Sequence, residues 1–163
     1  MIEIRPANGL QDIDEARRLF EEYASSLGFS LCFQGFDKEL AGLPGEYVPP
    51  DGRLLLAFVD GKPAGCAALH RFAETDSAEM KRLYVRPEFR GQYLGKRLVE
   101  ALIQDARMIG YRCVLLDTVV GKMDSAISLY RRNGFIEVES YRDNPMPGVI
   151  YMSLELAEDE VKK

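Results

Sequence analysis

A basic, glycine-containing turn between a strand-like segment and a helical segment constrains the fold most strongly. The turn occupies residues 86–97 and directly follows the strand-like segment 79–85. Leu94, Leu98 and Leu102 then recur every four residues, a spacing that predicts an amphipathic helix. The free N–H groups and the positive dipole end of such a helix favour an anion. We therefore expect a phosphate-bearing ligand at this turn, and specifically a pyrophosphate.

The side chains of the turn agree with this expectation. Gly91 and Gly95 have no side chain to keep a phosphate away from the backbone, and Arg90, Lys96 and Arg97 add positive charge. The P-loop does not match, because it has four residues between its glycines and then Lys followed by Ser or Thr. Here three residues separate the glycines, and an arginine follows the lysine. The dinucleotide-binding pattern G-x-G-x-x-G is also absent.

Length and charge exclude several classes of function. With 163 residues, the chain is long enough for one domain with a full core. Its net charge of −5 argues against a nucleic-acid-binding protein, because phosphate backbones are held mainly by basic surfaces. No apolar run approaches the roughly 20 residues of a membrane helix, and the N-terminal residues lack the pattern of an export signal. We therefore expect a cytoplasmic protein that contacts neither nucleic acid nor membrane.

Cysteine and histidine usage predicts no metal site. The three cysteines are far apart, and His70 is the only histidine. Cys66 and Cys113 lie in apolar, strand-like runs, which favours buried and inert thiols. Without clustered ligands, neither a zinc site nor histidine-based catalysis has support.

Strand and helix signals alternate along the chain. Strands are expected at 1–6, 53–59, 63–71, 77–85, 112–118, 135–141 and 149–156. A helix that runs to Leu27 is expected after a capping box at 12–15, and another helix after the expected cap Asp124. The helix of the basic turn should end at Gly110. Residues 29–52 are typical of a loop over a binding cleft, with one or two helical turns at 37–40.

Two motifs of the chain resemble those of the GCN5-related N-acetyltransferase (GNAT) family, and they occur in the order that the family has. The basic turn is similar to the family pattern Q/R-x-x-G-x-G/A, with Arg90 at its first position and Gly95 at its last. Tyr93 stands where the middle glycine is usual. Residues 126–135 are similar to the family signature A-x-x-L-Y-x-x-x-G-F. The resemblance covers about residues 53–156.

The resemblance implies a single acetyltransferase domain over residues 1–163. Residues 1–52 would form the acceptor-side helices and loop, 53–156 the cofactor-binding core, and 157–163 a charged tail. The implied fold class is mixed α/β (α+β). It has a twisted, mostly antiparallel sheet of about six or seven strands with a splayed parallel central pair, flanked by about four helices.

The resemblance also implies acetyl-CoA as the co-substrate, without a metal. The cofactor would lie where the strands 79–85 and 112–118 separate, with its pyrophosphate on the N–H groups of the turn. Backbone groups of Leu83 and Val85 would pair with its pantetheine amides. The cofactor-binding residues that we expect are Leu83, Tyr84, Val85, Arg90, Gly91, Gln92, Tyr93, Leu94, Gly95 and Lys96.

Glu79 and Tyr130 are the expected catalytic residues. An alkyl amine has a pKa of roughly 10, so a base must remove a proton before the amine attacks the thioester. By analogy with the family, Glu79 is that base, and its alternative is a strand residue paired with Lys81 or Arg82. Tyr130 carries a phenol that is protonated at neutral pH, so it would donate a proton to the departing thiolate. Its alternative is a core tyrosine.

The predicted acceptor is a small amine or an amino-acid-like molecule, and a peptide N-terminus or a protein lysine is the second choice. Its contacts are expected from segment 23–36 and loop 141–148, namely Tyr23, Phe33, Gln34, Tyr141 and Asn144. The rival hypothesis is a noncatalytic acyl-CoA sensor or interaction module, and the presence of both expected catalytic residues favours an enzyme. The sequence leaves a homodimer open.

Overall fold

The computed structural model describes residues 1–28, 35–121, 123–144 and 146–156. Its strands are β1 (Ile2–Pro6), β2 (Arg53–Val59), β3 (Lys62–Arg71), β4 (Ser77–Val85), β5 (Cys113–Val119), β6 (Ile136–Val138) and β7 (Val149–Glu155). Its helices are α1 (Gly9–Leu27), α2 (Phe36–Ala41), α3 (Leu94–Ile109) and α4 (Asp124–Arg132). Across these four described stretches, no helix is both long and apolar enough to cross a membrane.

The strands form one seven-stranded sheet in the order β1-β2-β3-β4-β5-β7-β6. β4 and β5 run parallel, and the other neighbouring strands of this sheet run antiparallel. The tight turn between β2 and β3 has Asp60 at φ 50° and Gly61 at φ 80°. Positive φ at both central residues matches the right-handed twist of a hairpin.

The strand order and the single parallel pair confirm the expected fold class.

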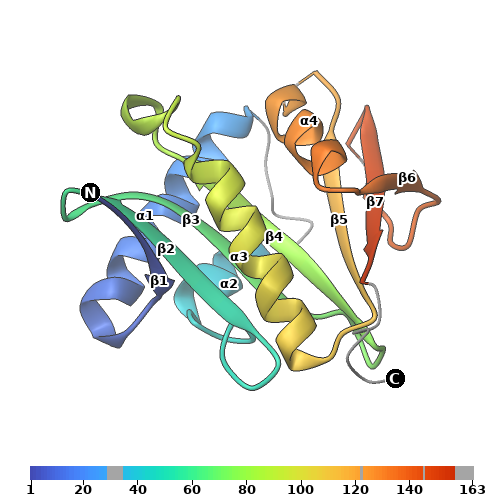
Figure 1. Cartoon of the computed structure of the whole chain (residues 1–163), viewed down its shortest axis with the longest axis horizontal. Coiled ribbons are helices and arrows are strands. Elements are labelled where there is room, and N and C mark those ends of the chain that lie inside the picture. Colours follow the sequence, from blue (N-terminus) through green and yellow to red (C-terminus); the bar gives the residue numbers. More distant parts are fainter. Residues whose placement is uncertain (29–34, 122, 145, 157–163) are drawn as a thin grey trace.

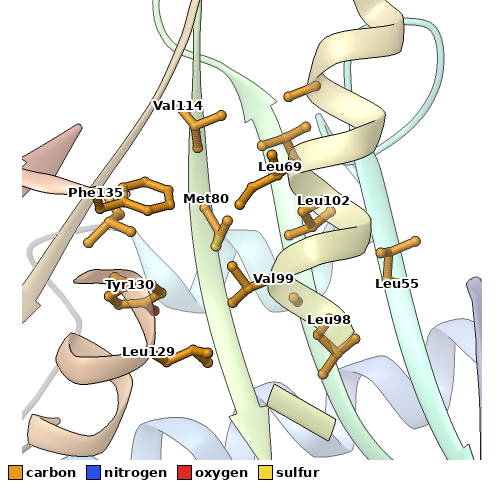
Figure 2. Close-up of a cluster of buried hydrophobic side chains, with 14 of the residues drawn as sticks. Leu55, Leu69, Met80, Leu98, Val99, Leu102, Val114, Leu129, Tyr130 and Phe135 are labelled. Carbon is orange, nitrogen blue, oxygen red and sulfur yellow. The ribbon is translucent and has the colours of Figure 1, made fainter. Parts of the chain in front are cut away.

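The sheet separates two apolar cores. Helix α3 crosses one face, and α1 and α2 lie behind the other (Figure 1). On the α1 face, Leu19 and Phe20 are fully buried against β2 and β3. On the opposite face, side chains of α3 point toward the sheet and join the buried end of α4 (Figure 2). Labelled members of this second core are Leu55, Leu69, Met80, Leu98, Val99, Leu102, Val114, Leu129, Tyr130 and Phe135.

β4 and β5 stay together over a short distance and then separate (Figure 1). Their register contains three pairs, and the last of these joins Glu79 to Leu115. Just beyond it, β4 carries a bulge: Arg82 and Leu83 lie opposite the single residue Ala67 of β3, and Arg82 has φ 63°. A bulge bends its strand and changes the direction of the side chains that follow it. The bulge therefore lies at the point where the parallel pair opens.

Two helices begin differently from the expectation. α1 starts at Gly9 with Asn8 as its N-cap residue, one turn before the capping box that we expected. Asp12 thus lies in the first turn, where its carboxylate accepts the N–H of Asn8 at 2.8 Å. In α4, Met123 is the N-cap residue and Asp124 is the first helical residue.

β6 is shorter than the strand expected at 135–141. It spans three residues and lies at the edge of the sheet, where Ile136 is 64% exposed. After Val138 the chain leaves the sheet, because Tyr141 and Arg142 turn toward the buried Glu79 instead of pairing with β7.

Candidate active site

A cavity of about 670 Å³ opens where β4 and β5 separate. Its walls come from the end of α1, the second half of β4, the basic turn, the end of β5 and helix α4. The expected cofactor-binding residues in its lining are Leu83, Tyr84, Val85, Arg90, Gly91, Tyr93, Leu94, Gly95 and Lys96. Gln92 belongs to the same turn but is not among the described residues of the lining.

The basic turn presents backbone N–H groups toward this cavity. The first hydrogen bond within α3 is donated by Arg97 to the carbonyl of Tyr93 at 3.0 Å. The N–H groups of residues 94–96 therefore precede the intrahelical ladder and are the donors that an anion at a helix N-terminus uses. Gly91 has φ 89°, and no atom lies within 4 Å of the place where its Cβ would be. The turn is thus open on the side of its glycine.

Tyr93 stands where the family pattern has a glycine and adopts a backbone conformation that favours glycine. It has φ 64°, in the left-handed region, and it is the N-cap residue of α3. Its side chain is 76% exposed. Left-handed backbone costs a non-glycine residue about 1–2 kcal/mol, so the turn tolerates some strain here. The chain thus reaches left-handed backbone at this position without a glycine.

Tyr130 faces the cavity from α4. The residue is 7% exposed, and its ring packs against Phe135 with the ring centres 5.7 Å apart. Burial raises the pKa of its phenol well above the ordinary value, and the nearby Tyr23 and Asp117 raise it further. The hydroxyl therefore remains protonated over the physiological pH range and can act as a proton donor.

Asp117 is a cavity residue that our reading of the sequence missed. It comes from β5, is half-buried and lines the cavity together with Tyr23 and Tyr130. Burial raises the pKa of Tyr23 to about 12, while the charges of Arg82 and Asp117 act on it in opposite directions. The available signal was a single carboxylate inside the apolar strand 113–119.

Lys81 provides a positive charge on the wall opposite Asp117. Glu79 pairs with Leu115, so their side chains lie on one face of the sheet. Lys81 and Asp117 each follow two residues later, and because side chains alternate along a strand they lie on that same face. Both residues line the cavity, one on each separated strand. Burial and the positive charge of Arg82 lower the pKa of Lys81. The cavity lining thus contains a carboxylate and an ammonium group, one on each separated strand.

Glu79 lies behind the cavity instead of in its described lining. Its side chain is fully buried, and its oxygens accept hydrogen bonds from Tyr141 at 2.8 Å and Arg142 at 2.6 Å. Nε2 of His70 lies 2.9 Å from the oxygen that Arg142 contacts. Burial raises the pKa of Glu79, but the His70 hydrogen bond and nearby positive charges outweigh it, so the pKa is lowered overall. The role of Glu79 as the base stays a prediction.

The residues expected to bind the acceptor lie in different parts of the structure. Tyr23 lines the cavity, whereas Tyr141 and Asn144 lie on the loop between β6 and β7. Asn144 contacts the cavity indirectly, because its amide donates a hydrogen bond to Oδ2 of Asp117 at 3.2 Å. Phe33 and Gln34 lie outside the described residues.

Comparison with known proteins decides the family. A family model described as the acetyltransferase (GNAT) family matches residues 13–135. The chain belongs to this GNAT family. An uncharacterised N-acetyltransferase of Schizosaccharomyces pombe is 43% identical over 148 residues, which cover 90% of each chain. With this membership, the protein is an acetyl-CoA-dependent N-acetyltransferase.

Solved structures share the GNAT fold. A GNAT acetyltransferase from Staphylococcus aureus superposes with a TM-score of 0.79 at 18% identity, covering 96% of this chain and 100% of the other. A PaiA N-acetyltransferase from Thermoplasma acidophilum, solved in complex with coenzyme A, gives a TM-score of 0.70 at 21% identity, covering 96% and 99%. At these identities the likeness concerns the fold alone.

Proposed function

We propose that this GNAT enzyme transfers the acetyl group of acetyl-CoA to the primary amine of a small, amino-acid-like molecule by direct attack. The observation that carries the proposal is that Asp117 and Lys81 line the cavity from the two separated strands, with Asp117 near enough to raise the pKa of the Tyr130 hydroxyl. An amino acid carries an ammonium and a carboxylate close together. The two walls of the cavity offer one opposite charge to each.

The cofactor is proposed to occupy the end of the cavity that is formed by the basic turn. The N–H groups of residues 94–96 and the cations Arg90 and Lys96 would bind its pyrophosphate. Because β4 pairs with β5 only as far as Glu79, β5 does not cover its edge at Leu83 and Val85, where Nε of Arg90 donates to the Val85 carbonyl at 2.9 Å. A pantetheine chain would add to that edge as a partial strand, which brings the thioester to Tyr130.

The reaction requires three proton movements. A carboxylate would first take one proton from the bound ammonium, and the neutral amine nitrogen would then attack the thioester carbonyl. When the carbon–sulfur bond breaks, the departing sulfur would receive the proton of the Tyr130 hydroxyl, and the second proton that the nitrogen loses as the amide forms would restore that hydroxyl. Asp117 is our first choice for that carboxylate because it lines the cavity. Glu79 remains the second candidate, because it lies outside the described lining and could receive the proton only through a residue bonded to it.

Matched acceptors test this proposal. CoA release would be measured with an amino acid, its amide and the amine that lacks the carboxylate, and with a peptide that has a free N-terminus. We expect the amino acid to have the highest kcat/KM, and Lys81→Gln to reduce that preference with the acetyl-CoA KM unchanged. Equal turnover of all three small acceptors would contradict recognition of the carboxylate. Binding of acetyl-CoA without CoA release would instead favour the noncatalytic sensor.

A further inference from the structure

We infer that Glu79 is a positioning residue, whose carboxylate holds the loop between β6 and β7 against the acceptor end of the cavity. The inference rests on the proposed function insofar as it concerns the acceptor. It assigns to Glu79 a role different from proton removal. It also explains why a charged side chain is fully buried at the last position where β4 pairs with β5.

The contacts of Glu79 come mainly from this loop. Tyr141 donates to one carboxylate oxygen at 2.8 Å, and Nη2 of Arg142 donates to the other at 2.6 Å. His70, the residue paired with Glu79 on the neighbouring strand β3, adds a contact at 2.9 Å to the oxygen that Arg142 also contacts. Hydrogen bonds to an ionised and buried carboxylate are stronger than neutral ones. One side chain of the central sheet therefore holds two consecutive residues of the loop.

Aromatic packing reinforces the same attachment. The ring of Tyr141 lies edge-on to Phe72 and to Tyr151, with ring centres 5.0 and 5.1 Å apart. The hydroxyl of Tyr151 donates to the backbone carbonyl of Arg142 at 2.8 Å. The position of the loop is thus fixed by its side chains and also by its backbone.

The attached loop reaches the cavity through Asn144. Its amide donates to Oδ2 of Asp117 at 3.2 Å, and its own carbonyl oxygen accepts the N–H of Met146 at 3.0 Å. Two residues separate Asn144 from Tyr141, so a shift of the loop would move the donor to Asp117. Glu79 would then set the orientation of Asp117 without contacting the acceptor itself.

The surroundings of Glu79 fit an anchor better than a base. Both oxygens already accept hydrogen bonds, and the residue lies outside the described lining of the cavity. The phenol of Tyr47 is close enough to interact with the charge of Glu79. The groups that lower the pKa of Glu79 are His70, Lys81, Arg142 and Tyr141, of which Lys81 acts through its charge. These groups favour the ionised form, and a carboxylate that holds its charge firmly is a weak proton acceptor.

Two variants separate the roles of anchor and base. Glu79→Gln keeps the shape but removes the charge, and Tyr141→Phe keeps the ring but removes one donor to Glu79. For both we expect faster amide hydrogen exchange at residues 139–148 and a higher acceptor KM. The increase can reach about 100-fold, because a misplacement of about 1 Å can cost that much. The acetyl-CoA KM and the shape of the pH–rate profile should stay as in the parent.

Glu137→Gln is the matched control, since Glu137 is an exposed carboxylate on β6, the strand that precedes the loop. It should change neither the exchange at 139–148 nor the acceptor KM. If Glu79→Gln does not fold, Tyr141→Phe decides alone, because it leaves the buried charge paired with Arg142.

Each outcome decides one of the two claims. If Glu79→Gln lowers kcat and removes the low-pH limb of the profile while Tyr141→Phe does not, Glu79 is the base and the inference is overturned. Unchanged hydrogen exchange at 139–148 in both variants also overturns it. If exchange rises as expected but the parent acetylates none of the acceptors tested, the anchor stands and the proposed function fails.

Discussion

The two ends of the cavity are built in different ways. The cofactor end consists largely of one continuous segment, in which β4, the basic turn and the first turn of α3 follow each other along the chain. It offers backbone N–H groups, which do not depend on the identity of the side chains. The acceptor end combines side chains from separate segments, above all Asp117, Lys81 and the loop residue Asn144. On the proposed function, a continuous segment that binds the cofactor can serve many enzymes of a family, whereas the assembled side chains would determine the acceptor.

The same contrast applies to the charges. Arg90 and Lys96 at the cofactor end are exposed, so water screens them and no single one should dominate binding. At the acceptor end Lys81 and Asp117 are half-buried, and Glu79 behind them is fully buried. Because charges interact more strongly where water is excluded, single substitutions there should have effects specific to the acceptor.

The largest expected effect lies where the two ends meet, at Tyr130. Tyr130→Phe keeps the ring and its packing against Phe135 while removing the hydroxyl. Loss of a positioned general acid typically costs about 10²–10⁴-fold in rate, and we expect a decrease of kcat in that range. Affinity for CoA and the melting temperature should change little. Tyr111→Phe, which removes the hydroxyl of another buried tyrosine outside the described lining, is the control. Turnover within a few-fold of the parent would make Tyr130 a core residue only.

A substitution in the turn should affect the cofactor end alone. Gly91→Glu would place a carboxylate beside the proposed pyrophosphate, and like charges in contact cost several kcal/mol, which corresponds to a loss of roughly 100-fold in CoA affinity. Since Gly91 has φ 89°, any side chain adds strain there, and Gly91→Ala measures that part separately. Titration calorimetry of both variants isolates the effect of the charge. Equal CoA affinities of the two variants would contradict the proposal that the pyrophosphate binds at this turn.

A smaller effect is expected from the loop. Asn144→Ala removes the hydrogen bond to Asp117 and should raise the acceptor KM by about tenfold, as for a lost hydrogen bond to a charged group. The KM for acetyl-CoA should not change. Asn8→Ala is a suitable control, because the side chain of Asn8 makes no capping hydrogen bond in α1. A parallel rise in both KM values would show that the two ends are not separable.

Much of the fold could be predicted from local patterns. The hairpin around Asp60 and Gly61, the strand 77–85 and the end of α3 at Gly110 follow from turn residues and from apolar spacing, and the structure has them at the expected positions. β6 was predicted too long because its length depends on a tertiary contact. The loop leaves the sheet in order to reach Glu79, and no periodicity of its own residues reports this.

In the candidate site, too, the features set by local sequence could be predicted and those set by tertiary contacts could not. The expected cofactor residues line the cavity, with Gln92 as the exception, because one continuous motif positions them. Asp117 could be noticed in the sequence as a carboxylate inside an apolar strand, but its relation to Lys81 could not be predicted, since it depends on the register between β4 and β5 and on where that pairing stops. Glu79 was singled out, but its partners on the loop lie 62 and 63 residues away in the sequence. Such contacts become visible only in the folded chain.

Mapping of backbone amide chemical shifts in stepwise titrations tests the separation of the two ends most directly. CoA would be added first, and an amino acid would then be added to the saturated complex. The account predicts that CoA shifts the amides of residues 91–96 and of Leu83 and Val85, and that the amino acid then shifts those of Asp117 and of residues 141–144. Shifts at 141–144 on CoA alone, with no change at 91–96, would contradict it.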